Sequence, residues 1–216
     1  MNINITIPTD LSEITLRQYK HFLKIQKSVD DEKFLGAKII EIFCGVNLED
    51  VMQIKFNDSE FIVETLTEMF EQKPNLVTKF KLKNKEYGFH PQLDDLTLGE
   101  YIDLDTFIGD WENIEKAMAV LYRPIVNKLK DKYSIEDYKV GKDAEILDMP
   151  MDAVLSSIFF LWNLGIDLSK TMMNYLDKEE TQALMQFLNS QPNGGGITQF
   201  TDLLKETLHD MKISLN

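Results

Sequence analysis

A short pattern that occurs twice constrains the fold of this chain more than any other feature of its sequence. The first copy is Leu11, Ile14, Thr15, Leu16 and Tyr19, and the second is Leu93, Leu96, Thr97, Leu98 and Tyr101. In each copy a threonine stands three residues before a glutamine or a glutamate, which is the spacing of a capping box at the start of a helix. The pattern therefore predicts one helix that is capped by Thr15 and Gln18 and another that is capped by Thr97 and Glu100.

The rest of the repeated pattern predicts how each helix start packs. Ile14 and Leu96 stand just before the threonines, where a hydrophobic staple would pack. Tyr19 and Tyr101 fall on the first buried turn of each predicted helix. Two interpretations remain open: two unrelated helices share a good cap, which we favour, or two substructures share an ancestral element.

Alternation of apolar and polar residues predicts a small β-sheet. Residues 2–7 alternate and then meet Pro8, which is typical of a strand. Residues 79–90 alternate around a turn at Asn84-Lys85, which predicts a hairpin. We therefore expect a mainly α, α+β fold, in which a multi-helix bundle carries a small antiparallel sheet made of the N-terminal strand and this hairpin.

Apolar periodicity predicts helices along most of the remaining chain. The predicted helical segments are 15–27, 32–43, 48–54, 59–72, 101–108, 111–126 with a kink or break at Pro124, 134–138, 153–164 ending at Gly165, 168–176 and 179–189. The expected parts are residues 1–90 with the strand, a helical subdomain and the hairpin, residues 91–190 as a helical core, and residues 191–216 as a tail, although one continuous domain with an arm is an alternative.

The expected tail begins with a glycine-rich linker and ends in an amphipathic segment. The linker is Gln191-Pro192-Asn193-Gly194-Gly195-Gly196. The apolar stripe that follows consists of Phe200, Leu203, Leu204, Leu208 and Met211. The stripe is typical of a helix that folds back on the core or of an arm that binds another chain, and both remain open.

The charge of the chain is strongly acidic. Lys and Arg number 23 against 36 Asp and Glu, for a net charge of −13, which disfavours binding to the phosphates of nucleic acid. Eight carboxylates and no basic residue lie between 94 and 115: Asp94, Asp95, Glu100, Asp103, Asp105, Asp110, Glu112 and Glu115. A solvated or lysine-paired face is the simplest interpretation, and we predict that Asp94, Asp95, Asp103 and Asp105 contact a partner protein. The row Lys79, Lys81, Lys83 and Lys85 either pairs with this face or blunts a strand edge.

No catalytic, cofactor or metal-binding motif stands out. The histidines at 21, 90 and 209 have no metal-ligand spacing, and the single cysteine, Cys44, lies in an apolar helical stretch. Phosphate-binding glycine loops and nucleophile elbows are missing from the sequence. The longest apolar run, 153–164, is too short to span a bilayer, so we expect a soluble protein without a cofactor or a membrane partner.

Three stretches of the sequence resemble a known family. They are Glu86-Tyr87-Gly88-Phe89-His90-Pro91, Leu96-Thr97-Leu98-Gly99-Glu100-Tyr101-Ile102-Asp103-Leu104 and Met118-Ala119-Val120-Leu121-Tyr122-Arg123-Pro124. Together they are similar to uncharacterised proteins of tailed bacteriophages, including crAss-like phages, that are described only as virion structural or tail-assembly proteins. The resemblance covers residues 80–165 and implies no catalytic residue.

The resemblance implies a non-enzymatic, virion-associated phage protein, either a structural or a cargo component of the portal or tail region, that acts through protein–protein contacts. Its expected partners are portal, ring or tail components, or other copies of itself, and its expected location is the virion or the host cytoplasm during assembly. Three alternatives remain: a tail-assembly chaperone that is not retained in the virion, an acidic mimic of DNA, and a phage enzyme with Mg²⁺ at Asp103, Asp105, Glu112 and Glu115.

Overall fold

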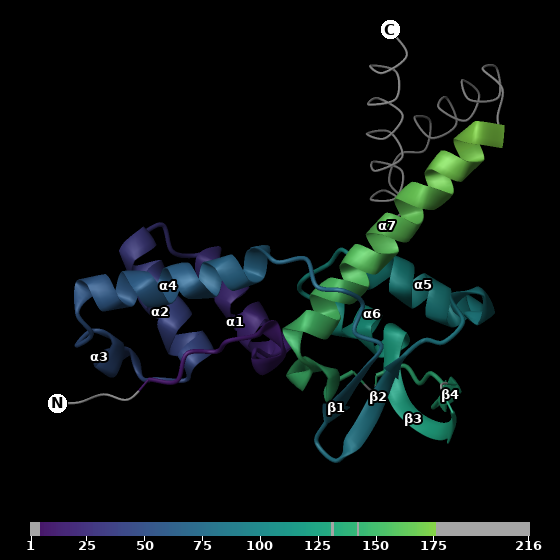
Figure 1. Ribbon diagram of the computed structural model, residues 1–216, viewed down its shortest axis with the longest axis horizontal. Coiled ribbons are helices and arrows are strands. Elements are labelled where there is room, and N and C mark those ends of the chain that lie inside the picture. The colour runs from purple at the N-terminus through teal and green to yellow at the C-terminus, as the bar shows by residue number, and fades with distance from the viewer. Residues whose placement is uncertain (1–4, 131, 142, 176–216) are drawn as a thin grey trace, which may run out of the picture.

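The computed structural model describes residues 5–130, 132–141 and 143–175 (Figure 1). This part of the chain forms seven α-helices and one four-stranded antiparallel sheet, which confirms the predicted α+β class. The α-helices are α1 (Leu16–Gln26), α2 (Glu32–Cys44), α3 (Leu48–Val51), α4 (Phe56–Glu71), α5 (Leu98–Phe107), α6 (Ile114–Leu121) and α7 (Met151–Tyr175). The strands are β1 (Lys79–Leu82), β2 (Lys85–Phe89), β3 (Tyr122–Leu129) and β4 (Lys132–Ile135), and short 3-10 helices are η1 (Leu11–Glu13), η2 (Leu93–Asp95) and η3 (Ile146–Asp148).

Helices α1 to α4 gather on one side of the molecule, and the sheet lies on the other side with α5 and α6 (Figure 1). Aromatic rings join α1 to both parts, because Tyr19 lies 5.3 Å from Phe70 of α4 and 5.1 Å from Trp111 between ring centroids. One cluster of buried apolar side chains runs through both parts. The predicted division of the chain at residue 90 stays a prediction, and the sheet joins strands from both sides of that position.

Both predicted capping boxes form. The Thr15 hydroxyl accepts a hydrogen bond from the Gln18 backbone N–H, and the Gln18 side chain accepts from the Thr15 N–H. Thr97 and Glu100 make the same two contacts at the start of α5. The tyrosines do not share one environment, however: Tyr19 is half-buried among aromatic rings, whereas Tyr101 is 51% exposed and its predicted burial is wrong.

The sheet has the order β1-β2-β3-β4, with every neighbouring pair antiparallel. The predicted hairpin is confirmed as β1 and β2, and its turn includes Lys83 at a φ of 54°. The predicted N-terminal strand is wrong for its described part, since residues 5–9 form no strand. The nearby segment pairs instead with the entry to α7, where the Leu16 N–H donates to the Met149 carbonyl and the Met151 N–H donates to the Ile14 carbonyl.

The other two strands come from segments that the sequence pattern predicted as helix. The helix predicted over 111–126 ends at Leu121, and the chain continues directly as β3. The helix predicted over 134–138 is also wrong, because residues up to Ile135 form β4. Strand β3 forms here because its first residues find an edge to pair with, as Gly88 and Phe89 of β2 stand opposite Arg123 and Tyr122.

Helix α7 begins in the core and extends away from the rest of the fold (Figure 1). Met151, Ala153 and Val154 are fully buried, and the Tyr122 hydroxyl donates to the Val77 and Ala153 carbonyls. The predicted end of this helix at Gly165 is wrong, since the helix continues to Tyr175. An interior glycine costs a helix only about 1 kcal/mol, which the apolar residues on either side outweigh.

Candidate functional site

A buried ion pair joins α5 to β3. The Glu100 Oε1 atom of α5 is 2.7 Å from the Arg123 Nη1 atom of β3, and the two side chains are only 5% and 9% exposed. The other carboxylate oxygen of Glu100 accepts hydrogen bonds from the Thr97 N–H and hydroxyl at 2.8 and 2.7 Å. One carboxylate therefore caps α5 and also neutralises a buried cation of the sheet.

The charge of Glu100 is maintained against its burial. Desolvation alone would raise its pKa, but the hydrogen bonds from Thr97 and the positive charge of Arg123 outweigh that effect and hold the pKa below its ordinary value. Arg123 keeps one unsatisfied group, since its Nε atom is buried and has no hydrogen-bond partner among the described residues.

His90 lies next to this ion pair and is 8% exposed. Its backbone N–H donates to the Leu121 carbonyl at 2.7 Å, and its Nδ1 atom accepts from the Gln92 N–H at 3.4 Å. Burial lowers the pKa of the imidazole, and the charge of Arg123 lowers it further. His90 is therefore neutral at pH 7 and serves as a polar wall of the cluster.

Tyr138 lies near the Arg123 guanidinium. Its ring centroid lies 6.0 Å from the guanidinium carbon, and its hydroxyl donates to Asp103 Oδ2 at 2.5 Å. Burial and the hydrogen bond to Asp103 raise the pKa of this phenol well above its ordinary range. Tyr138 consequently stays protonated, and the Asp103 carboxylate accepts an internal hydrogen bond from it.

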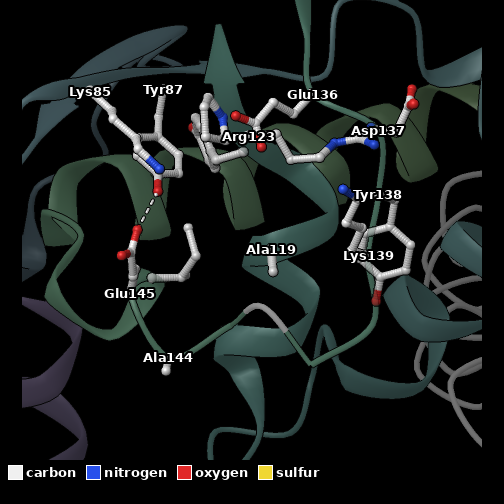
Figure 2. A pocket seen from close by; sticks show the side chains of 13 residues that line it. Lys85, Tyr87, Ala119, Arg123, Glu136, Asp137, Tyr138, Lys139, Ala144 and Glu145 are labelled. Carbon is white, nitrogen blue, oxygen red and sulfur yellow. Dashed lines mark hydrogen bonds between the residues drawn. The ribbon is translucent and has the colours of Figure 1, made fainter.

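A cavity of about 240 Å³ adjoins the cluster. Figure 2 shows Tyr87 and Glu145 facing each other on one side of it, at 3.2 Å between the phenol oxygen and the carboxylate, with Tyr138 and Lys139 on the other side. Burial, helped by the charge of Glu145, raises the pKa of Tyr87 to about 12. The charged side chains of the lining are Lys85, Arg123, Glu136, Asp137, Lys139 and Glu145. Cations and anions balance there, so the cavity favours neither an anionic nor a cationic ligand.

The acidic stretch between 94 and 115 is largely used in internal contacts. Glu112 pairs with Lys27 at 2.8 Å, and Glu115 pairs with Lys20, so two carboxylates tie this stretch to α1. Their partners are not the lysine row at 79–85, and Lys79 and Lys81 belong to β1 at the edge of the sheet.

Of the four acidic residues that we predicted as partner contacts, two lie on the surface. Asp94 and Asp95 are exposed on η2. Asp103 and Asp105 are half-buried, and burial raises the pKa of Asp105. Within the described ranges, no group of three or more His, Cys, Asp or Glu side chains is placed to hold a metal ion. The carboxylates of the proposed Mg²⁺ site therefore do not converge there.

The outer part of α7 carries large apolar side chains on its surface. Trp162, Leu164 and Leu168 are 49%, 46% and 52% exposed. The Trp162 ring stacks on Phe159 with 6.3 Å between centroids. The sequence pattern missed this surface, because it placed the end of the helix at Gly165 and assigned the whole segment to the core.

By length and composition, residues Met151–Leu168 could cross a membrane, and 28% of this window is buried inside the protein. The buried part is its first two turns, where Ser156 and Ser157 are enclosed and the Ser157 hydroxyl lies 3.5 Å from the Met118 sulfur. A bilayer could take up the whole of this window only if those turns left the core.

The predicted contact residues of the tail, Phe200, Leu203, Leu204, Leu208 and Met211, lie outside the described residues. The arm that they were predicted to form stays a prediction.

Comparison of the chain with family models, with curated proteins and with solved structures finds no match.

Proposed function

We propose that this chain is a non-enzymatic protein of a tailed bacteriophage, associated with the portal or tail region of the virion, and that it acts through protein–protein contacts on α7. The observation that carries the proposal is the exposure of large apolar side chains around the outer part of α7, with Trp162 on one face and Leu164 and Leu168, four residues apart, on another. Large apolar side chains that gather on one projecting element are typical of interaction sites, and tryptophan is enriched at the centres of interfaces.

The way α7 is anchored supports a docking role. Its first turns are buried, and the Met151 N–H and the Ala153 carbonyl are hydrogen-bonded to Ile14 and Tyr122. A helix whose base is fixed in a core presents its outer part in one defined orientation, which lowers the entropic cost of binding. The outer part of α7 is therefore preorganised for a partner.

The phage assignment rests on the three family-like stretches. Their polar residues Glu100 and Arg123 pair with each other inside the fold, next to His90. A motif whose charged groups neutralise each other and whose histidine is neutral is suited to maintaining a fold. This is the role that a motif without catalytic residues would have, and it supports a structural protein.

Quantitative mass spectrometry of purified particles of the encoding phage tests the proposal. We expect the chain at a fixed multiple of the copy number of the portal protein. Abundance in infected cells with absence from particles would overturn the virion assignment and would favour a tail-assembly chaperone instead.

A second experiment tests α7 itself. Particles are grown with the plasmid-encoded variant Trp162→Asp/Leu168→Asp in place of the native chain, and incorporation into the virion is measured. Leu98→Asp is the matched control, because Leu98 is 75% exposed on the first turn of α5, where an acidic residue is tolerated. We expect loss of incorporation for the α7 variant only, and equal incorporation of both variants would refute the assignment of this surface.

A further inference from the structure

A groove lies among helices α2, α3 and α4, on the side of the molecule away from the sheet. Helices α2, α3 and α4 enclose about 830 Å³ of open space, which is within the size range of clefts that bind ligands. Its apolar lining is formed by Gly36, Ala37, Val51, Met52, Ile54, Phe56 and Val63. Met52 and Phe56 are each 59% exposed, so the groove has a wide apolar mouth.

The shape of the groove follows from small residues on α2 and from one face of α4. Gly36 and Ala37 bring little side chain to the α2 side of the groove, and a Cβ atom on Gly36 would be in ordinary contact, at 3.6 Å, with a Val63 methyl group of α4. On α4 the lining positions are Phe56, Ser59, Glu60, Val63 and Glu64, which have helical spacing. Two helix faces with small residues between them form the kind of site that accepts a third helix.

The rim of the groove is acidic. Glu32, Glu60 and Glu64 line it and are exposed, and none of them has an ion-pair partner among the described residues. Helix α4 as a whole carries five carboxylates and no lysine or arginine. The one cation of the lining, Lys33, lies 6.0 Å from the centroid of the Phe56 ring.

We propose that this groove binds a basic amphipathic helix of another protein. Apolar side chains of that helix would enter the groove past Met52 and Phe56, and its lysines or arginines would pair with Glu32, Glu60 and Glu64. The exposed Phe56 ring offers a further site for a cation or an apolar side chain. The outer part of α7 is a separate surface, so this proposal does not depend on the function proposed above.

Charge selects this partner over the other candidates. The chain's own segment 197–213 contains Asp202, Glu206 and Asp210 against Lys205 and Lys212, so it does not complement an acidic rim. A second copy would bring a net charge of −13 to the same surface. Anionic membrane headgroups would be repelled for the same reason.

Selection from a yeast-displayed library of random peptides of about 16 residues, with the full-length chain as bait, tests the proposal. We expect the enriched peptides to carry apolar residues at helical spacing together with an excess of lysine and arginine. Neutral or acidic enriched peptides would overturn the proposal, and so would a selection without enrichment.

Paired variants then locate the binding site of the enriched peptides. Glu60→Lys/Glu64→Lys reverses the rim, and its control Glu68→Lys/Glu71→Lys makes the same change in charge on the same helix beyond the groove. We expect the rim variant to weaken binding by roughly tenfold or more and the control by less than about twofold at physiological ionic strength. Equal losses would indicate a diffuse attraction and would contradict a site in the groove.

A second pair tests the apolar part of the groove. Gly36→Leu adds a side chain to its lining, whereas Gly36→Ala adds only a methyl group at an ordinary contact distance. Both variants remove the glycine, and circular dichroism confirms that each is folded. Binding should be lost in Gly36→Leu and retained in Gly36→Ala, and retention in both would refute the proposal.

Discussion

Replacement of Arg123 by methionine leaves the Glu100 carboxylate buried without its cation. In the folded protein the two side chains are 9% and 5% exposed and their charged atoms are 2.7 Å apart. Removal of one partner of a buried ion pair costs about 3–5 kcal/mol. Glu100 retains two hydrogen bonds from Thr97, so the lower end of this range, about 3 kcal/mol, is expected for Arg123→Met.

Two further variants separate the charge from the loss of packing. Arg123→Met/Glu100→Gln has no buried charge, and glutamine retains the capping box, as Gln18 does in α1. It should recover at least about 1.5 kcal/mol of the loss. Lys27→Met removes the cation of an exposed pair with Glu112, in which the side chains are 67% and 70% exposed. That control should cost less than about 1 kcal/mol.

Urea denaturation followed by circular dichroism measures the free energy of unfolding of all four proteins, and thermal unfolding checks the order. For a protein of this length, 3 kcal/mol corresponds to a decrease in Tm of roughly 6–12 °C. A loss below about 1 kcal/mol for Arg123→Met, or a double variant no more stable than the single one, would refute the assignment of a buried charge pair.

Three other predictions concern the sheet, the histidine and the caps. Gly88→Ala should lower the free energy of unfolding in urea by about 2–3 kcal/mol, because the new Cβ would lie 2.4 Å from Cε2 of Tyr133. The Tyr133 ring cannot easily move away, since its hydroxyl donates a hydrogen bond to the Phe89 carbonyl. A decrease below about 0.5 kcal/mol would contradict this contact. Because the pKa of His90 is lowered in the folded protein, the unfolded chain takes up this proton at a higher pH than the folded one, and the free energy of unfolding should decrease as the pH falls below 6.5. His90→Gln should flatten this pH dependence. An unchanged pH profile would show that His90 is not its source. Thr15→Ala and Thr97→Ala should each cost about 1 kcal/mol, and a negligible loss in either would mean that its capping box contributes little.

Features that depend on neighbouring residues could be predicted from the sequence. The caps at Thr15 and Thr97 form because each threonine and its N3 partner are within reach along one turn of chain. The hairpin of β1 and β2 follows from apolar alternation on both sides of a short turn. In both cases the partner atoms are a few residues away, so the local pattern contains nearly all of the information.

The errors occurred where a segment's partner is distant in the sequence. Tyr122 and Arg123 continue an apolar helical pattern, yet they form a strand because the free edge of β2 accepts them. Residues 5–7 alternate like a strand, but they pair with neither edge strand of the sheet, and Ile5 and Ile7 pack against the core instead. Propensity is weak compared with the hydrogen bonds and burial that a sheet edge provides.

For the candidate surfaces, too, the sequence predicted overall properties but not which side chains would be paired or exposed. Composition predicted an acidic protein, but not that Glu100, Glu112 and Glu115 would pair with cations from other elements while the carboxylates of α4 have no ion-pair partner among the described residues. The apolar run of α7 did not indicate that its first turns are core and its outer part is surface.

The sequence by itself determined the capped starts of α1 and α5 and the turn between β1 and β2, because these depend on contacts within a few residues, and it fixed the overall charge through composition. Only the tertiary structure decided which carboxylates are neutralised and which apolar side chains remain exposed. It also decided that Tyr19 of the first copy of the repeated pattern is half-buried, whereas Tyr101 of the second copy is exposed. These outcomes depend on burial and on partners that are distant in the sequence. Contacts between distant segments produce no local sequence pattern from which they could be predicted.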